Sequence, residues 1–203
     1  MNLSNIKLIQ HIPIVHNGIF RFKLNMKKEY IAEFKKQKFV PTEKNYNLNY
    51  VSTNLNILNK YKSLNKDITN TLKYFIKNVL FIKANFRIYK SWLTLTNPKG
   101  NSSSHSHSNA WISGIYYPEY NKDFKIKFYN DIKNDFDAKV VKYNIYNSKS
   151  FTIVPEENEL IIFFSNLRHT ILTNFSNKNR YSLAFNCLPS GLFGEGDSKS
   201  EFI

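Results

Sequence analysis

From Phe86 onward, hydrophobic residues come in short runs that alternate with polar residues, a pattern typical of β-strands. The runs are rich in β-branched and aromatic residues, and Asn, Lys, Asp and Gly separate them. They span residues 86–96, 110–117, 124–130, 139–146, 150–155, 159–165, 169–175 and 180–189. Successive strands without intervening helices predict a mostly β fold, a jelly-roll or barrel.

Before Phe86 the pattern is mixed. Residues 6–24 alternate weakly and predict one or two strands, broken at Pro13 and at the turn 16–18. Residues 27–38 predict a short helix, and the polar stretch 41–54 predicts a loop. A further helix is predicted by apolar residues at i, i+4, i+8, i+11, i+12 and i+15, which are Leu64, Ile68, Leu72, Phe75, Ile76 and Val79. We expect this stripe to pack on the outside of the sheet.

The length and composition predict a single domain. The chain has 203 residues, and no linker rich in Pro, Gly or Ser divides it. Within residues 1–203 we expect N-terminal strands and supporting helices over 1–85, a β core over 86–190 and a loosely held tail over 191–203. No apolar run approaches the roughly 20 residues that span a membrane, so no membrane partner is expected.

Charge and cysteine content bear on partners and location. The net charge of +14 arises in residues 1–100, which hold 18 Lys and Arg against 4 Asp and Glu. A nucleic-acid partner is disfavoured, because only 4 of the 29 basic residues are Arg and interleaved exposed aromatics are not evident. The single cysteine, Cys187, excludes an intramolecular disulfide, and a cytoplasmic location is the simplest interpretation.

The segment Ser91 to Tyr117 holds the main candidate for chemistry. His105 and His107 lie one residue apart in a turn between two strand-like runs. On an extended backbone both imidazoles point to the same side, where they can bind one metal ion. His169, the only other histidine in the C-terminal half, is the candidate third ligand, and Arg180 follows it.

These residues resemble the non-haem Fe(II)- and 2-oxoglutarate-dependent oxygenases, in particular a bacterial and phage group related to prolyl hydroxylases. The resemblance covers roughly residues 80 to 190. Its motifs are Ser91-Trp92, Gly100, His105-x-His107, the strand 113–117 (Ser-Gly-Ile-Tyr-Tyr), Ser165 to His169, Arg180 and Phe185-Asn186.

The resemblance implies a double-stranded β-helix that binds Fe(II) and 2-oxoglutarate. His105, His107 and His169 would be the catalytic metal ligands, and Arg180 would bind the distal carboxylate of 2-oxoglutarate, with Tyr117 and Ser182 beside it. The implied reaction uses molecular oxygen to hydroxylate a small-molecule or peptide substrate while 2-oxoglutarate is decarboxylated to succinate. A phage-encoded enzyme would work in the host cytoplasm.

The sequence departs from the superfamily at His107, where most members have an acid. A three-histidine triad is favoured, because the resembling group also has His-x-His. An acid from another loop, such as Asp123 or Asp131, and a degenerate site are the alternatives. At the level of function, a cupin-like metal enzyme without 2-oxoglutarate would leave Arg180 without a role, and a silent basic binding module would explain only the charge.

Overall fold

A computed structural model describes residues 18–25, 30–42, 47–131, 139–144 and 147–202. In these residues one large sheet has the strand order β1-β8-β5-β10-β4-β3-β2, with β11 paired to β10, and a small sheet has the order β7-β6-β9. The strands are β1 (Ile19–Lys23), β2 (Phe39–Pro41), β3 (Asn49–Ser52), β4 (Asn85–Thr96), β5 (Ile112–Tyr117), β6 (Ile126–Tyr129), β7 (Ser150–Ile153), β8 (Glu159–Phe164), β9 (His169–Ile171), β10 (Arg180–Phe193) and β11 (Ser200–Phe202). The helices are α1 (Ile31–Lys35), η3 (Ile57–Lys60), α2 (Lys62–Tyr74), the π-helix η4 (Phe75–Val79) and η5 (Gly196–Ser198).

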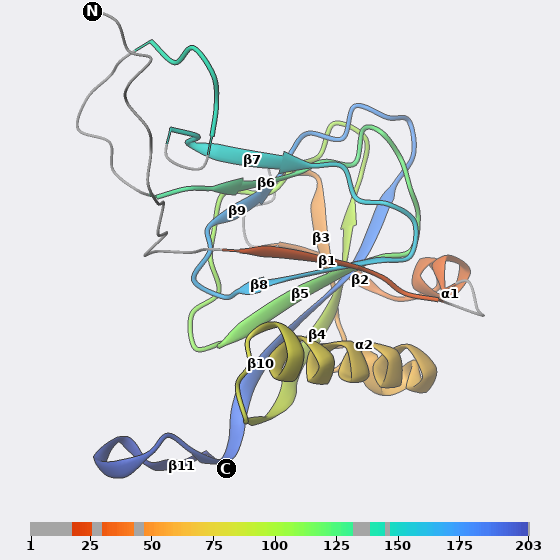
Figure 1. The fold of residues 1–203 in the computed structure, drawn as a ribbon. Coiled ribbons are helices and arrows are strands. Elements are labelled where there is room, and N and C mark those ends of the chain that lie inside the picture. The colour runs from red at the N-terminus through yellow and green to blue at the C-terminus, as the bar shows by residue number, and fades with distance from the viewer. Residues whose placement is uncertain (1–17, 26–29, 43–46, 132–138, 145–146, 203) are drawn as a thin grey trace, which may run out of the picture.

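The two faces of the large sheet pack against different layers of the protein. Successive side chains along each strand point alternately to one face and to the other. Along β10, Leu183, Phe185 and Cys187 belong to the apolar cluster on the helix side, whereas Ala184 belongs to the cluster between the two sheets. Helix α2 covers the first face, and β6, β7 and β9 lie over the other (Figure 1). The arrangement is the expected double-stranded β-helix.

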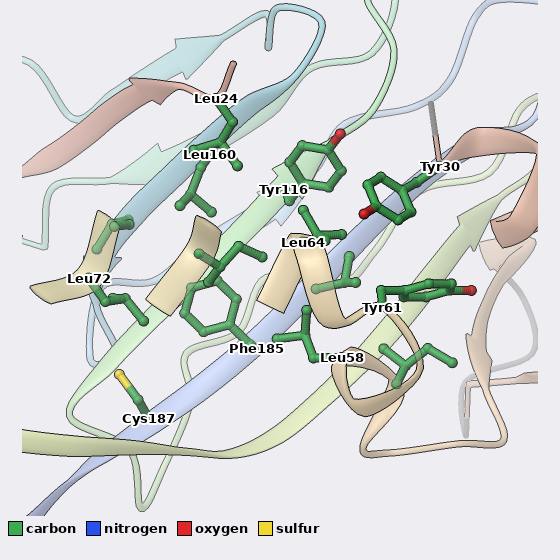
Figure 2. Close-up of a cluster of buried hydrophobic side chains, with 14 of the residues drawn as sticks. Leu24, Tyr30, Leu58, Tyr61, Leu64, Leu72, Tyr116, Leu160, Phe185 and Cys187 are labelled. Carbon is green, nitrogen blue, oxygen red and sulfur yellow. The ribbon is translucent and has the colours of Figure 1, made fainter. Parts of the chain in front are cut away.

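The helix-side core fixes the large sheet. Leu64, Ile68 and Leu72 of α2 are fully buried, which confirms the predicted stripe, and Phe75 and Ile76 continue it into η4. Figure 2 shows Leu64 and Leu72 pointing toward side chains of the sheet, among them Phe185, Leu160 and Tyr116. Burying each such side chain stabilises the fold by about 1.5 to 3 kcal/mol.

Gly114 of β5 lies against this core, and we expect Gly114→Ala to destabilise the protein by about 1 to 3 kcal/mol through overpacking. A Cβ atom there would lie 2.3 Å from Cζ of Phe185, whose ring is fully buried. Urea denaturation of Gly114→Ala, of Phe185→Leu and of the double variant tests this. The alanine should cost much less when the Phe185 ring has been replaced by a leucine side chain, and equal costs would contradict the explanation.

Three local predictions were wrong. Residues 139–144 form no strand, and Val141 and Tyr143 are 96% and 72% exposed, so that run has no surface to pack against. The loop predicted over 41–54 contains β3, which pairs with β4 through its backbone despite its polar composition. The expected loose tail pairs back on β10 through β11. The short helix predicted over 27–38 is present as α1, which ends at Lys35, and residues 27–29 of that prediction lie outside the described residues.

The N-terminal strands join the same sheet as the β core. Strand β1 pairs with β8, and β3 pairs with β4, so the expected boundary at residue 85 does not divide the large sheet. The strand prediction for residues 6–17 lies outside the described residues. None of the helices in the described part of the chain has the length and apolar character needed to cross a membrane.

Candidate active site

The backbone brings the three predicted histidines together between the two sheets. His105 and His169 form an antiparallel bridge, with N to O distances of 2.9 and 2.8 Å, and the His107 backbone N–H donates to the Ser165 carbonyl at 2.9 Å. One ring nitrogen from each histidine lies within 4.8 Å of the others. A metal ion about 2.1 Å from each nitrogen holds them within about 4.2 Å, so small ring rotations complete the site.

Hydrogen bonds to backbone carbonyls orient two of the rings. Nδ1 of His105 lies 2.8 Å from the Ser103 carbonyl oxygen, and Nδ1 of His169 lies 2.9 Å from that of Leu167. A carbonyl oxygen only accepts, so each Nδ1 carries the proton of the neutral imidazole. The lone pair is then on Nε2, which is the arrangement of metal-bound histidines with a fixed outer partner.

Burial keeps two of the imidazoles neutral. Desolvation and the neighbouring His105 and His107 together lower the pKa of His169 to about 3, against the raising effect of the Leu167 carbonyl. Desolvation, His105 and Lys90 together lower the pKa of His107 to about 4. At neutral pH both rings are therefore free of protons that would compete with a metal.

The metal-free protein should lose stability as the pH falls below about 6.5, the ordinary histidine pKa. Below that value His107 and His169 take up protons in the unfolded chain but stay neutral in the folded one, until the pH reaches their folded pKa values of about 4 and 3. Each contributes a slope of up to about 1.4 kcal/mol per pH unit. Chemical denaturation from pH 7 to 4 measures it, and His169→Gln should show a shallower slope. An unchanged slope would contradict the assignment.

Arg180, the predicted cosubstrate ligand, is the first residue of β10. The side chain is 1% exposed, and its Nη atoms donate to the Lys125 carbonyl oxygen at 3.2 Å and to the Tyr117 hydroxyl at 3.1 Å. Among the described residues, its Nε–H has no acceptor and no carboxylate pairs with it. Burial lowers the pKa of Arg180, whereas Tyr117 raises it. A buried cation without a counter-ion is costly and indicates an anionic ligand.

Tyr117 supplies a second donor beside Arg180. The fully buried hydroxyl accepts from Arg180, and no described residue accepts its own proton. Desolvation raises the pKa of Tyr117 against the opposing effects of Arg180, which keeps the hydroxyl protonated. Ser182, two residues beyond Arg180, is 2% exposed and lies opposite Thr94 of β4. Alternation places Ser182 on the same face of β10 as Arg180.

The donor set fits Fe(II) and 2-oxoglutarate. Three imidazoles on one side of a centre suit Fe(II), and the Nε–H of Arg180 with the Tyr117 hydroxyl suits a carboxylate. No carboxylate of the described residues joins the cluster of histidines. Neither of the alternative acids is part of this cluster. Asp131 forms an ion pair with Arg168, and the backbone N–H of Asp123 donates a hydrogen bond to Asn121 Oδ1.

Several neighbours of the histidines had no role assigned from the sequence. The rings of Phe163 and Phe128 lie 4.8 and 5.8 Å from His169, and Trp92 lies 5.7 Å from His107. They belong to β8, β6 and β4 and point into the space between the two sheets. Their positions could have been predicted from the alternation of side chains along each strand, once the face that points inward was known. Close packing explains why residue 100 is a glycine, because a Cβ atom there would lie 2.6 Å from the Leu48 carbonyl oxygen.

Comparison with known proteins agrees with this chemistry. Residues 90–186 match the model of a family described as "Putative 2OG-Fe(II) oxygenase". That span contains the three histidines and Arg180. A search of curated proteins finds no match.

Solved structures share the fold at low identity. A prolyl-4-hydroxylase from Pseudomonas putida is 13% identical with a TM-score of 0.58, over 86% of this chain and 94% of that one. HygX from Streptomyces hygroscopicus, with nickel and 2-oxoglutarate bound, is 7% identical with a TM-score of 0.61, over 85% and 83%. SnoN, a non-haem α-ketoglutarate-dependent epimerase of nogalamycin biosynthesis, is 10% identical with a TM-score of 0.63, over 86% and 77%.

The fold is therefore the jelly-roll that these solved structures share. Residues 90–186, which hold the three histidines and Arg180, match the family of putative 2-oxoglutarate- and Fe(II)-dependent oxygenases, whose cofactors are Fe(II) and 2-oxoglutarate.

Proposed function

We propose that the protein is a 2-oxoglutarate-dependent hydroxylase that acts on an amino-acid or peptidyl side chain. His105, His107 and His169 hold Fe(II), and Arg180, Tyr117 and Ser182 hold the distal carboxylate of 2-oxoglutarate. The other substrate is molecular oxygen. When bound, the iron and 2-oxoglutarate supply oxidative decarboxylation to succinate, coupled to oxidation of a C–H bond.

The observation that carries this proposal is the buried Arg180 guanidinium, which has neither a carboxylate partner nor an acceptor for its Nε–H among the described residues. A cupin-like metal enzyme without 2-oxoglutarate would use the histidines but would leave the Nε–H of Arg180 without an acceptor in a fully buried site. A binding module would require neither feature. A dicarboxylic cosubstrate explains both, because one end reaches the metal centre and the other neutralises Arg180.

The remaining site residues exclude water and fix geometry. Phe128 and Phe163 are buried against His169, so they shield that side of the metal centre. Cys187 takes no part in the chemistry, because it faces the helix-side core and burial raises its pKa to about 12. A free thiol of this kind suits a reducing compartment, and we propose that the chain acts in the cytoplasm as one domain.

The class of substrate is supported by the fold shared with the Pseudomonas putida prolyl-4-hydroxylase. The test is incubation with Fe(II), 2-oxoglutarate and air in the presence of free amino acids and short peptides, followed by mass spectrometry. We expect succinate to form together with a product heavier by one oxygen atom. Succinate coupled to a product of unchanged mass, as an epimerase would give, would contradict hydroxylation.

A further inference from the structure

Lys90 and Asn186 form a pair of donors on the inward face of the large sheet. They are register partners on β4 and β10, and directly opposite residues have Cβ atoms about 4.5 to 5.5 Å apart. Ala184 and Trp92, the next inward pair along these strands, belong to the cluster between the two sheets. Alternation therefore places Lys90 and Asn186 on the face that carries the candidate site.

A chain of hydrogen bonds orients the Asn186 amide. Ser113 Oγ donates to Asn186 Oδ1 at 2.9 Å, so the contact of 2.8 Å between Ser113 and Ser165 uses the proton of Ser165. With its oxygen held by Ser113, the amide turns its Nδ2 group the other way. Asn186 is 5% exposed, and no described residue accepts a hydrogen bond from Nδ2.

Lys90 is a half-buried cation without a carboxylate partner among the described residues. Its Nζ atom lies 5.4 Å from the centroid of the Trp92 ring, whose own centroid lies 5.7 Å from that of His107. The Trp92 ring thus contacts both the ammonium group of Lys90 and the ring of His107. An anion that binds there lies beside the centre where oxidation takes place.

The cosubstrate does not account for this second cationic position. Arg180 and Asn186 are six residues apart on β10, which is roughly 20 Å at a rise of about 3.3 Å per residue. 2-Oxoglutarate is much shorter than that, so with one carboxylate at Arg180 it does not reach Lys90. The bulge between Asn186 and Cys187 also places Arg87, opposite Leu188, on the inward face beyond Lys90.

We propose that the substrate carries a carboxylate or phosphate group that Lys90 and Asn186 bind, with its adjoining apolar part lying on Trp92. This inference rests on the proposed function, because it identifies the group as part of the substrate of that reaction. A charge-assisted bond from Lys90 and an amide bond from Asn186 give the anion two fixed donors. The distance between this anion and the iron then selects which C–H bond is oxidised.

The test uses Trp92 as its own reporter. The chain has two tryptophans, so Trp111→Phe assigns the two indole N–H resonances. The full chain, with Zn(II) and saturating 2-oxoglutarate so that Arg180 is filled, is titrated with phenylacetate, phenyl phosphate and neutral phenylacetamide. We expect a saturable shift of the Trp92 resonance with at least one anion and not with the amide, and the comparison of the two anions identifies the preferred group.

Three variants make the result specific. Lys90→Met should weaken the anion at least tenfold, and Asn186→Ala should weaken it about two- to tenfold, the range for one neutral hydrogen bond. Lys73→Met, on the exposed side of α2, should leave it unchanged. Equal affinity in Lys90→Met, or no saturable shift with either anion, would overturn the proposal. The affinity for 2-oxoglutarate is measured in a separate titration. Failure of the proposed function, which would appear as a loss of 2-oxoglutarate binding, is therefore distinguishable from failure of this proposal.

Discussion

His107→Ala is expected to lose Fe(II), with affinity reduced by more than about 100-fold, the upper end of the loss seen when only an outer partner of a ligand is removed. His107 is one of the three imidazoles with ring nitrogens within 4.8 Å of one another, and no carboxylate of the described residues lies in this cluster. The measurement is bound iron after gel filtration, with 2-oxoglutarate turnover alongside.

Two further variants complete this experiment. His107→Asp places a carboxylate ligand at the same backbone position and should keep iron and activity. Ser106→Ala, an exposed residue between the two histidines, is the matched control and should behave as wild type. Full iron occupancy in His107→Ala would contradict the three-histidine assignment, although His105, His169 and Arg180 would still support an oxygenase.

Arg180→Lys should weaken 2-oxoglutarate by about 10- to 150-fold while leaving iron affinity close to wild type, because a charged hydrogen bond contributes about 1.5 to 3 kcal/mol. Lysine keeps the charge but loses the planar fork that presents Nε–H while both Nη atoms are engaged by Lys125 and Tyr117. Paired calorimetric titrations of metal and cosubstrate separate the two affinities.

The matched control is Arg21→Lys. Arg21 lies on β1 of the same sheet, but its guanidinium is paired with Glu159 and is partly exposed. This variant should bind 2-oxoglutarate as wild type does. Equal affinity in the wild type and in Arg180→Lys would remove Arg180 from the cosubstrate site.

Much of the fold could be predicted because burial on both faces leaves a strong pattern. Strands β4, β5, β8 and β10 and the stripe of α2 follow from hydrophobic periodicity alone. Strand β3 and the run at 139–146 were mispredicted for opposite reasons. Strand β3 is held by backbone pairing to β4 and β2, which composition does not reveal, while Val141 and Tyr143 face solvent.

The candidate site shows a similar division. The histidines and Arg180 could be located because metal and carboxylate chemistry requires particular side chains, and the structure brings the histidines together. The carbonyl oxygens of Ser103, Leu167 and Lys125 have no signature in a sequence, since every residue carries one. The placement of Arg87 also depends on a bulge, which reverses the inward and outward positions of β4.

Anaerobic titration of the Fe(II)-loaded protein with 2-oxoglutarate tests the central claim most directly. Two-point chelation of the iron by the cosubstrate produces a visible metal-to-ligand charge-transfer absorption. We predict that this absorption appears and saturates at one 2-oxoglutarate per iron, and that Arg180→Lys reaches the same end point only at about 10- to 150-fold higher concentration. Iron-loaded wild-type protein that develops no such absorption would contradict the assignment of this site to Fe(II) and 2-oxoglutarate.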